Sequence, residues 1–285
     1  MNADTAFREA LAGTEDGRPV ATRNGTRIYL GPRLLTYPAH YARITSRPVP
    51  DRIVAAEFIW MMAGHCSSIN YLHTHNIHIW DKWVKPNGKL GPIYGTQWRD
   101  YQSDWVDQVK MAIERLTDNP GDTQALVTAW NPLELADMAL PPCHFAHQPI
   151  LVPTSDGYDL ELHVFQRSCD ILIGLPFNMS FYGLVAQFYA RLLTARCGTP
   201  IIPILVRHHI SHAHIYDVHL QDAPTREWIQ YVVSQNPAIS TPPWIVPSED
   251  FEPILASQLP APETLTRHAA PISPRFPKLR LEVIA

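Results

Sequence analysis

The chain has 285 residues, 46% of them hydrophobic and 18% charged, so it is long enough to bury a large core. Its formal net charge of -4 is spread along the chain without a run of lysines or arginines, which argues against a nucleic-acid partner and against a membrane surface. A small soluble ligand is expected instead.

The beginning of the chain, MNADTAFREALAG, lacks a charged region followed by an apolar one, and no stretch reaches the roughly 18 apolar residues of a membrane span. We therefore expect a cytoplasmic protein. Its four cysteines form no CxxC pair, which indicates reduced thiols rather than a disulfide framework.

Residues 51–64, DRIVAAEFIWMMAG, are predicted to form a helix that begins at Asp51 and ends at Gly64. The helix is apolar on nearly every side and is therefore expected to be buried. Glu57 is the exception. A carboxyl group in an apolar setting favours its protonated form and can act as a general acid or base, but Glu57 could also lie at the helix edge and pair with an arginine.

A second helix is predicted over 103–117, with Ser103 as its cap and an apolar stripe that includes Trp105. Strands are predicted at the ranges 123–130, 145–153, 158–167 and 201–207, with the turn TSDG joining the second and third as a hairpin. A long apolar helix over about 177–197 ends at Gly198. Helices and strands together indicate one α/β domain spanning 1–285.

The C-terminal region is rich in proline, with ten of the 27 prolines from Gln235 onward, so long regular elements are not expected there. We expect extended chain that covers the rest of the domain.

Cys143 lies in the stretch PPCHFAHQ, where it could be a buried small side chain, a metal ligand or a nucleophile. The segment RHHISHAHIYDVH has five histidines, yet zinc sites usually show ligand pairs at fixed short spacing, which this segment lacks. A zinc deaminase would need a second cysteine soon after Cys143, and there is none at that spacing. No metal is expected.

Two short segments offer groups for binding a nucleotide. The segment QRSCD brings Arg167, Ser168 and Asp170 together, a set suited to an anion and a polar ring. The segment GLPFN places Asn178 at a helix start, where its amide could pair with the edge of a nucleobase. Each segment could equally be an ordinary junction between a loop and a helix.

Taken together, five ordered segments resemble the thymidylate synthase family, and the similarity runs from about Arg23 to Gln221. These segments are NYLHTHNIHIWDKW, LGPIYGTQWR, AWNPLELADMALPPCH, QRSCDILIGLPFN and HIYDVHLQ. The resemblance implies a mixed α/β (α+β) fold with a large mixed β-sheet flanked by helices. It also implies a homodimer whose sheets pack back to back, and methylenetetrahydrofolate as the one-carbon donor.

The same resemblance implies the catalytic roles. Cys143 resembles the nucleophile that adds to C6 of the pyrimidine, which makes C5 nucleophilic. Glu57 resembles the general acid, Tyr94 a residue that helps remove the C5 proton, and His144 the pocket histidine beside the nucleophile. Asn178 resembles the residue that binds O4 and N3 of the base, and an asparagine there, where cytosine-specific relatives carry aspartate, indicates uracil.

Binding roles are carried over in the same way. Predicted ligands of the nucleotide comprise the phosphate ligands Arg23, Arg167 and Ser168, the ribose ligands His214 and Tyr216, and Gln166. Predicted residues of the folate pocket are Trp80, Trp83, Asp170, Ile173, Gly174 and Phe177.

Three departures from the family pattern stand out. Thr123 and Gln124 occupy the positions of an arginine pair with which the partner subunit grips the phosphate. Phe145, Ala146 and His147 replace the aromatic run after the nucleophile. The region from about 222 to 285 is atypical, because some fifty proline-rich residues precede PRFPKLRLEVIA, so the family's closing tail is absent or rebuilt.

The changed tail and the extra histidine near the thiol favour attack by water on the intermediate. The favoured reaction is therefore hydroxymethylation of dUMP, as in related phage and antibiotic-pathway enzymes. Ordinary thymidylate synthesis from dUMP is the first alternative, supported by Trp80, which shields the intermediate in the synthases. Hydroxymethylation of a cytidylate and a non-catalytic nucleotide-binding relative are the others.

Overall fold

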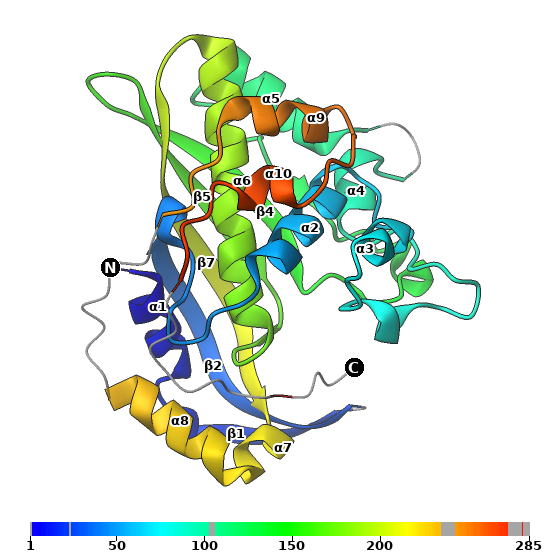
Figure 1. Ribbon diagram of the computed structural model, residues 1–285, viewed down its shortest axis with the longest axis vertical. Helices are drawn as coiled ribbons and strands as arrows, with labels where there is room; N and C mark the ends of the chain where they lie inside the picture. The colour runs from blue at the N-terminus through cyan, green and yellow to red at the C-terminus, as the bar shows by residue number, and fades with distance from the viewer. Residues whose placement is uncertain (1, 23, 103–105, 235–242, 273–280, 282–285) are drawn as a thin grey trace.

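The computed structural model of the protein describes residues 2–22, 24–102, 106–234, 243–272 and 281. Its centre is a mixed sheet of seven strands in the order β1-β2-β7-β5-β4-β3, with β6 beside β7 (Figure 1). The strands are β1 (Arg18–Thr22), β2 (Gly25–Pro38), β3 (Val127–Thr128), β4 (His144–Pro153), β5 (Tyr158–Gln166), β6 (Cys169–Asp170) and β7 (Ile201–Tyr216). The pairs β5–β7 and β6–β7 are parallel and the others antiparallel.

Helices cover one face of this sheet, and α6 (Gly174–Cys197) lies across its middle (Figure 1). Other α-helices are α1 (Ala3–Leu11), α2 (Asp51–Met62), α3 (Asn70–Thr74), α4 (Gly95–Arg99), α5 (Gln108–Asp118), α7 (Asp217–Gln221), α8 (Ala223–Ser234), α9 (Glu252–Leu255) and α10 (Glu263–Thr266). Short 3-10 helices are η1 (Thr14–Asp16), η2 (Ala39–Tyr41), η3 (Asp81–Trp83), η4 (Leu135–Asp137) and η5 (Ser248–Asp250). The expected large mixed sheet flanked by helices is confirmed.

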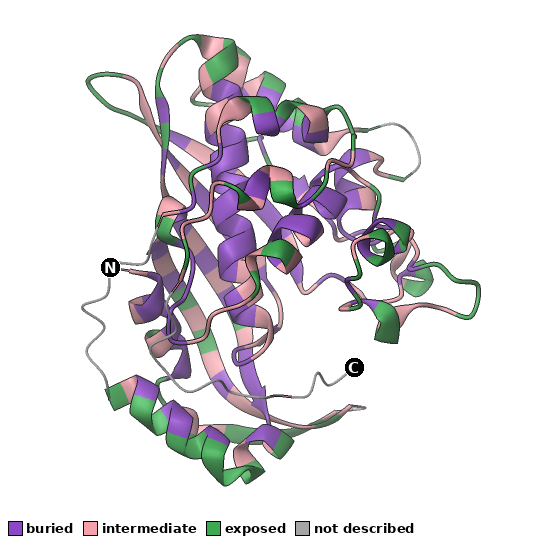
Figure 2. Ribbon diagram, viewed as in Figure 1, coloured by how far each residue is buried: buried purple, intermediate pink, exposed green. Residues whose placement is uncertain are grey.

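The buried helix α6 is apolar on all sides because it has neighbours on all sides. It packs on β7 and β5 below and against α2, α5 and η5 (Figure 2). The predicted helix 177–197 is confirmed, with an earlier start at Gly174 and the expected left-handed glycine, Gly198, at its end. The helix predicted over 51–64 is α2, which ends at Met62, and Asp51 pairs with Arg43 instead of capping the helix.

The hairpin predicted from TSDG is confirmed. Strands β4 and β5 pair antiparallel, and Thr154 donates its backbone N–H to the carbonyl of Gly157 at 2.9 Å. Gly157 has a φ of 156°, and a Cβ there would lie 2.1 Å from the carbonyl oxygen of Pro200, so only glycine fits.

Two sequence predictions were wrong in their extent. Helix α5 begins at Gln108 with Asp107 as its cap, whereas Ser103 and Trp105 lie outside the described residues. The strand predicted over 123–130 is only Val127–Thr128, and the side chain of Gln108 binds both the backbone N–H and the carbonyl of Thr128.

Strand β7 continues nine residues beyond the predicted end at 207 and holds four of the five clustered histidines. Its alternation places His208 in the core, whereas His209 faces the other side of the sheet, where it stacks on Phe165. The cluster therefore does not converge on one point. In the described ranges, the only three potential metal ligands that meet are the exposed side chains of His73, His78 and Asp81.

The proline-rich segment 243–272 lies over α2, α6 and η2 and holds only short helices, as predicted. Trp244 is its main anchor: its indole donates to the carbonyl of Leu265, and its own backbone bonds to His40 and Gln187. The segment 243–272 thus adds to the core that α2 and α6 form.

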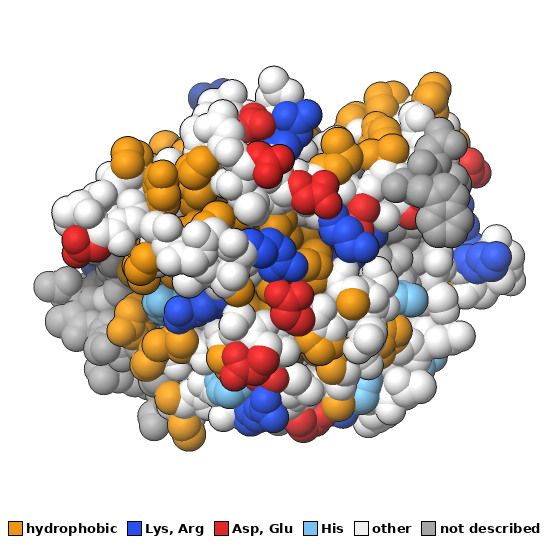
Figure 3. Space-filling view, turned by 90° about the horizontal axis from the view of Figure 1, so that it is seen from above, with side chains coloured by type: hydrophobic (Ala, Val, Ile, Leu, Met, Phe, Trp, Pro, Cys, Tyr) orange, Lys and Arg blue, Asp and Glu red, His pale blue; other side chains and the backbone are white. Residues whose placement is uncertain are grey.

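The face of the molecule in Figure 3 shows acidic and basic side chains side by side among hydrophobic ones, as the small net charge predicts. No helix within the described ranges is both long and apolar enough to cross a membrane.

Candidate functional site

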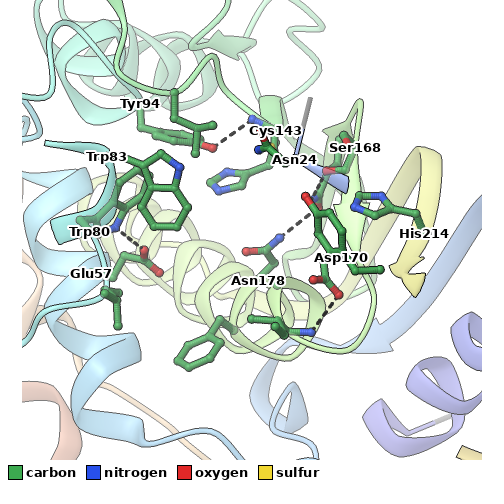
Figure 4. A pocket seen from close by; sticks show the side chains of 18 of the residues that line it. Asn24, Glu57, Trp80, Trp83, Tyr94, Cys143, Ser168, Asp170, Asn178 and His214 are labelled. Carbon is green, nitrogen blue, oxygen red and sulfur yellow. Dashed lines mark hydrogen bonds between the residues drawn. The ribbon is translucent and has the colours of Figure 1, made fainter. Parts of the chain in front are cut away.

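A pocket of about 320 Å³ opens at the end of the sheet where β4, β5 and β7 meet α6 (Figure 4). It brings together most residues that the sequence proposed. They are Glu57, Trp80, Trp83, Tyr94, Cys143, His144, Gln166, Ser168, Asp170, Ile173, Gly174, Phe177, Asn178, His214 and Tyr216. Arg167 does not line this pocket, and Arg23 lies outside the described residues.

Cys143 lies just before β4, at the rim between the pocket and the sheet. Its backbone N–H donates to the hydroxyl of Tyr94 at 3.0 Å, and its carbonyl accepts from the N–H of Arg167 at 2.8 Å. Burial raises the pKa of the Cys143 thiol, whereas the guanidinium groups of Arg167 and Arg27 favour the thiolate. Cys143 is thus a free thiol, and two nearby cations favour its charged form against the effect of burial.

Tyr94 is held in an unusual backbone conformation, with a φ of 37° at the start of α4. The next residue is Gly95, where a Cβ would lie 1.9 Å from the carbonyl oxygen of Met61. This close approach of α4 to α2 turns the phenol of Tyr94 toward Cys143.

Glu57 faces the pocket from α2, opposite the side of Cys143 (Figure 4). The indole Nε1 of Trp80 donates to its carboxyl oxygen at 2.9 Å, so its partner is an indole and the arginine alternative is wrong. Burial raises the pKa of Glu57 to about 7, although the Trp80 hydrogen bond opposes the rise. Glu57 can therefore hold or release a proton near neutral pH.

His144 and His147 both point into the core, because a β-bulge between His144 and Ala146 puts them on the same side of β4. Each bonds a tyrosine hydroxyl of α6: His144 Nδ1 lies 2.7 Å from Tyr182, and His147 Nε2 lies 2.9 Å from Tyr189. Burial lowers the pKa of both rings to about 3, so both are neutral.

Only His144 of these two reaches the pocket, where its ring stacks on Tyr94. His147 is fully buried away from it. The expectation that an extra histidine lies near the thiol and favours water is therefore wrong.

Aromatic and apolar side chains form the side of the pocket near Glu57. Trp80 packs against Trp83 and Tyr94, and Ile79 and Leu140 complete this wall. Across the pocket, the backbone N–H groups of residues 172 and 173 donate to Asp170 Oδ1 at 3.0 and 3.2 Å, which leaves its other oxygen for a ligand. A flat, partly polar ring would fit between them.

Arg27 is a pocket residue that sequence reasoning missed. It lies opposite Tyr216 in the β2–β7 ladder, and one of its terminal nitrogens donates to the Tyr216 hydroxyl at 2.8 Å. Its Nε is buried and has no partner in the described part of the chain. Its partner Tyr216 belongs to the HIYDVH motif, but the sequence did not show which strand pairs with that motif.

The predicted phosphate ligand Arg167 is engaged elsewhere: its guanidinium donates to the carbonyls of Pro141 and Pro142 at 2.8 and 2.9 Å. It thereby braces the loop that carries Cys143. Thr123 and Gln124 are exposed and lie outside the pocket of this chain.

The chain was compared with models of known protein families. Residues 13–243 fit the family model described as thymidylate synthase. The matched range includes every side chain that lines the pocket, and it ends where the proline-rich segment 243–272 begins.

Proposed function

The chain belongs to the thymidylate synthase family of folate-dependent one-carbon transferases acting on dUMP-like nucleotides, and from that premise we propose that it transfers a one-carbon unit to C5 of a uracil nucleotide by way of a covalent bond between Cys143 and C6. The observation that carries the proposal is the meeting of Cys143, Tyr94, Glu57 and Asn178 in one pocket. A nucleophile, two groups that move protons and an amide for the base are what this reaction needs.

In the proposed reaction the thiolate of Cys143 adds to C6, and the electron pair of the C5–C6 double bond moves toward C5. Arg167 and Arg27 stabilise the thiolate before this step. Glu57, which holds a proton up to about pH 7, supplies it to the pyrimidine, and the Tyr94 hydroxyl helps to remove the proton from C5. C5 uses that electron pair to bond the one-carbon unit, and loss of the C5 proton and release of the thiol then restore the C5–C6 double bond.

Methylenetetrahydrofolate is the proposed co-substrate. When bound it would supply the one-carbon unit and, for the methyl product, the hydride that reduces this unit, and it would leave as dihydrofolate. The donor set fits its pterin ring, since Trp80, Trp83 and Phe177 offer flat apolar surfaces and the free oxygen of Asp170 can accept from ring N–H groups. Ile173 and Gly174 line the same pocket.

The sugar and phosphate lie at the other end of the pocket in this proposal. His214 and Tyr216 bind the ribose, and Ser168, Arg27 and Arg23 bind the phosphate, with Arg167 joining them if it releases the proline carbonyls. Arg27 then compensates in part for the arginine pair that Thr123 and Gln124 replace.

The methyl product is the one that the pocket's shape supports. Trp80 is nearly inaccessible to solvent, tied to Glu57 and packed on Tyr94, so an apolar wall excludes water from the reacting atoms. Hydroxymethylation remains the second candidate, because the family match ends at 243 and the resemblance leaves the family's closing tail absent or rebuilt.

A homodimer with sheets packed back to back is part of the same proposal. On the face of the sheet away from α6, Leu34, His209 and Phe165 occupy paired positions across three strands, and Leu34 is 60% exposed. An apolar and aromatic row of this kind is suited to a second copy. Each chain is proposed to be a single domain with an atypical C-terminal region.

The decisive experiment incubates the protein with methylenetetrahydrofolate and dUMP, UMP, dCMP or CMP in turn, with product mass and dihydrofolate absorbance as readouts. A methylated uracil base with an equal amount of dihydrofolate is expected. A hydroxymethylated base without dihydrofolate would replace the first candidate by the second. Binding of nucleotide without turnover would favour a non-catalytic relative.

A further inference from the structure

Four side chains from four elements form one continuous hydrogen-bonded chain behind the pocket. The Tyr37 hydroxyl lies 3.3 Å from His208 Nδ1, and His208 Nε2 lies 2.7 Å from Gln166 Oε1. The same oxygen accepts from Asn178 Nδ2 at 3.2 Å, and Gln166 Nε2 donates to the backbone carbonyl of Ser168 at 2.9 Å. Tyr37, His208 and Gln166 are buried, whereas Asn178 faces the pocket (Figure 4).

The chemistry of these groups determines the direction of each bond. The Ser168 carbonyl can only accept, so Gln166 must turn its NH₂ toward it and its oxygen toward His208 and Asn178. That oxygen can only accept, so His208 must carry its proton on Nε2 and Asn178 must turn its NH₂ toward Gln166.

Tyr37 lies at the far end of this row of hydrogen bonds, next to His208. Burial lowers the pKa of His208 to about 3, so the ring is neutral and carries one proton only. With that proton on Nε2, His208 Nδ1 is an acceptor, and the Tyr37 hydroxyl donates to it.

A fixed amide matters because uracil and cytosine differ in the order of donor and acceptor at one edge. Uracil offers the acceptor O4 beside the donor N3–H, whereas cytosine offers a donor amine beside the acceptor N3. An asparagine that can turn its amide over can pair with either base. Held by Gln166, Asn178 keeps one N–H and its oxygen in a single order toward the pocket, and turning over would set its oxygen against Gln166 Oε1.

We propose that His208 and Tyr37 are positioning residues that select uracil over cytosine, because through Gln166 they prevent the Asn178 amide from turning over. The inference rests on the proposed function, in which Asn178 pairs with the base. Neither His208 nor Tyr37 lines the pocket, so both act only through Gln166.

A second tyrosine–histidine pair in the same core is a matched control. The Tyr189 hydroxyl is hydrogen-bonded to the buried ring of His147, but neither residue lines the pocket. Tyr37→Phe and Tyr189→Phe therefore remove the same kind of bond, and only the first should alter base selection.

The test measures kcat/KM for a uracil and a cytosine nucleotide with the same sugar and phosphate, together with the melting temperature of each variant. His208→Phe is expected to lower the uracil-to-cytosine ratio by about tenfold or more. The variant removes the N–H that donates to Gln166 Oε1, so the Gln166 amide is no longer fixed. Tyr37→Phe should lower it by about threefold, since the ring then keeps its place but not its tautomer. Tyr189→Phe should leave it unchanged.

An unchanged ratio in folded His208→Phe overturns the inference, as does an equal fall in Tyr189→Phe. If His208→Phe does not fold, the comparison of Tyr37→Phe with Tyr189→Phe decides. The same variants can also be combined with Cys143→Ala. Calorimetry then measures the affinity for each nucleotide, and hence the base selection, in the absence of turnover. A failure of the proposed reaction is therefore seen as absent turnover in the unaltered protein, separately from a failure of the selection.

Discussion

The two ends of the pocket differ in how far their polar groups are already satisfied. At the reacting end, as proposed for Cys143 and Glu57, Tyr94 accepts from the backbone N–H of Cys143 and Trp80 donates to the Glu57 carboxyl. At the end proposed for sugar and phosphate, Arg27 keeps a buried Nε without a partner among the described residues. The reacting end is thus organised before substrate arrives, whereas the other end still has hydrogen-bonding capacity for an anionic ligand.

The largest effect expected is at the reacting end, from Cys143→Ala. Removal of the nucleophile should lower kcat by at least about ten-thousandfold, because no other group can form the bond to C6. Cys197→Ser is the matched control, since this half-buried thiol at the end of α6 lies outside the pocket. Turnover that persists in Cys143→Ala would exclude the covalent mechanism.

Glu57→Gln should lower kcat by about a hundredfold to ten-thousandfold, as expected for loss of a general acid. The amide can still accept from Trp80, so the KM for nucleotide should change little. Steady-state kinetics at pH 6.5 would measure both, with the exposed Glu263→Gln as control. An unaltered kcat would remove Glu57 from the mechanism.

At the other end, Arg27→Gln should raise the KM for the nucleotide by about tenfold to a hundredfold, with a smaller change in kcat. The reason is the loss of a charge-assisted contact to the sugar-phosphate group. Arg18→Gln, on the exposed strand β1, is the control. If Arg27→Gln lowered kcat and left KM unchanged, the assignment of Arg27 to nucleotide binding would be wrong.

The smallest effect is a change of pH dependence within the reacting end. As the pH rises through about 7, Glu57 loses its proton, so a step that needs the protonated acid slows. The Trp80 hydrogen bond lowers the pKa of Glu57, so Trp80→Phe should move this decline to higher pH by up to about one unit. A profile of kcat against pH for both proteins measures it, and a move to lower pH would contradict the assigned cause.

Much of the pocket could be predicted because its residues lie in short segments with their own spacing. QRSCD and GLPFN lie at the junctions of β5, β6 and α6, and the apolar sequence around Glu57 already required burial. The hairpin of β4 and β5 followed from alternation and one turn. Strand β2 was missed because most of its residues are only partly buried, which weakens the hydrophobic alternation.

The sequence by itself determined which chemical groups this protein has, and through their motifs it indicated that they act together. The tertiary structure decided which of them meet. Arg27 and Tyr216 are 189 positions apart, and one bulge in β4 sends His147 toward Tyr189 and away from the thiol. The direction of the Asn178 amide likewise depends on contacts from β2, β5 and β7. Such contacts exist only once strands have paired, because register and burial arise from the whole sheet and not from local spacing.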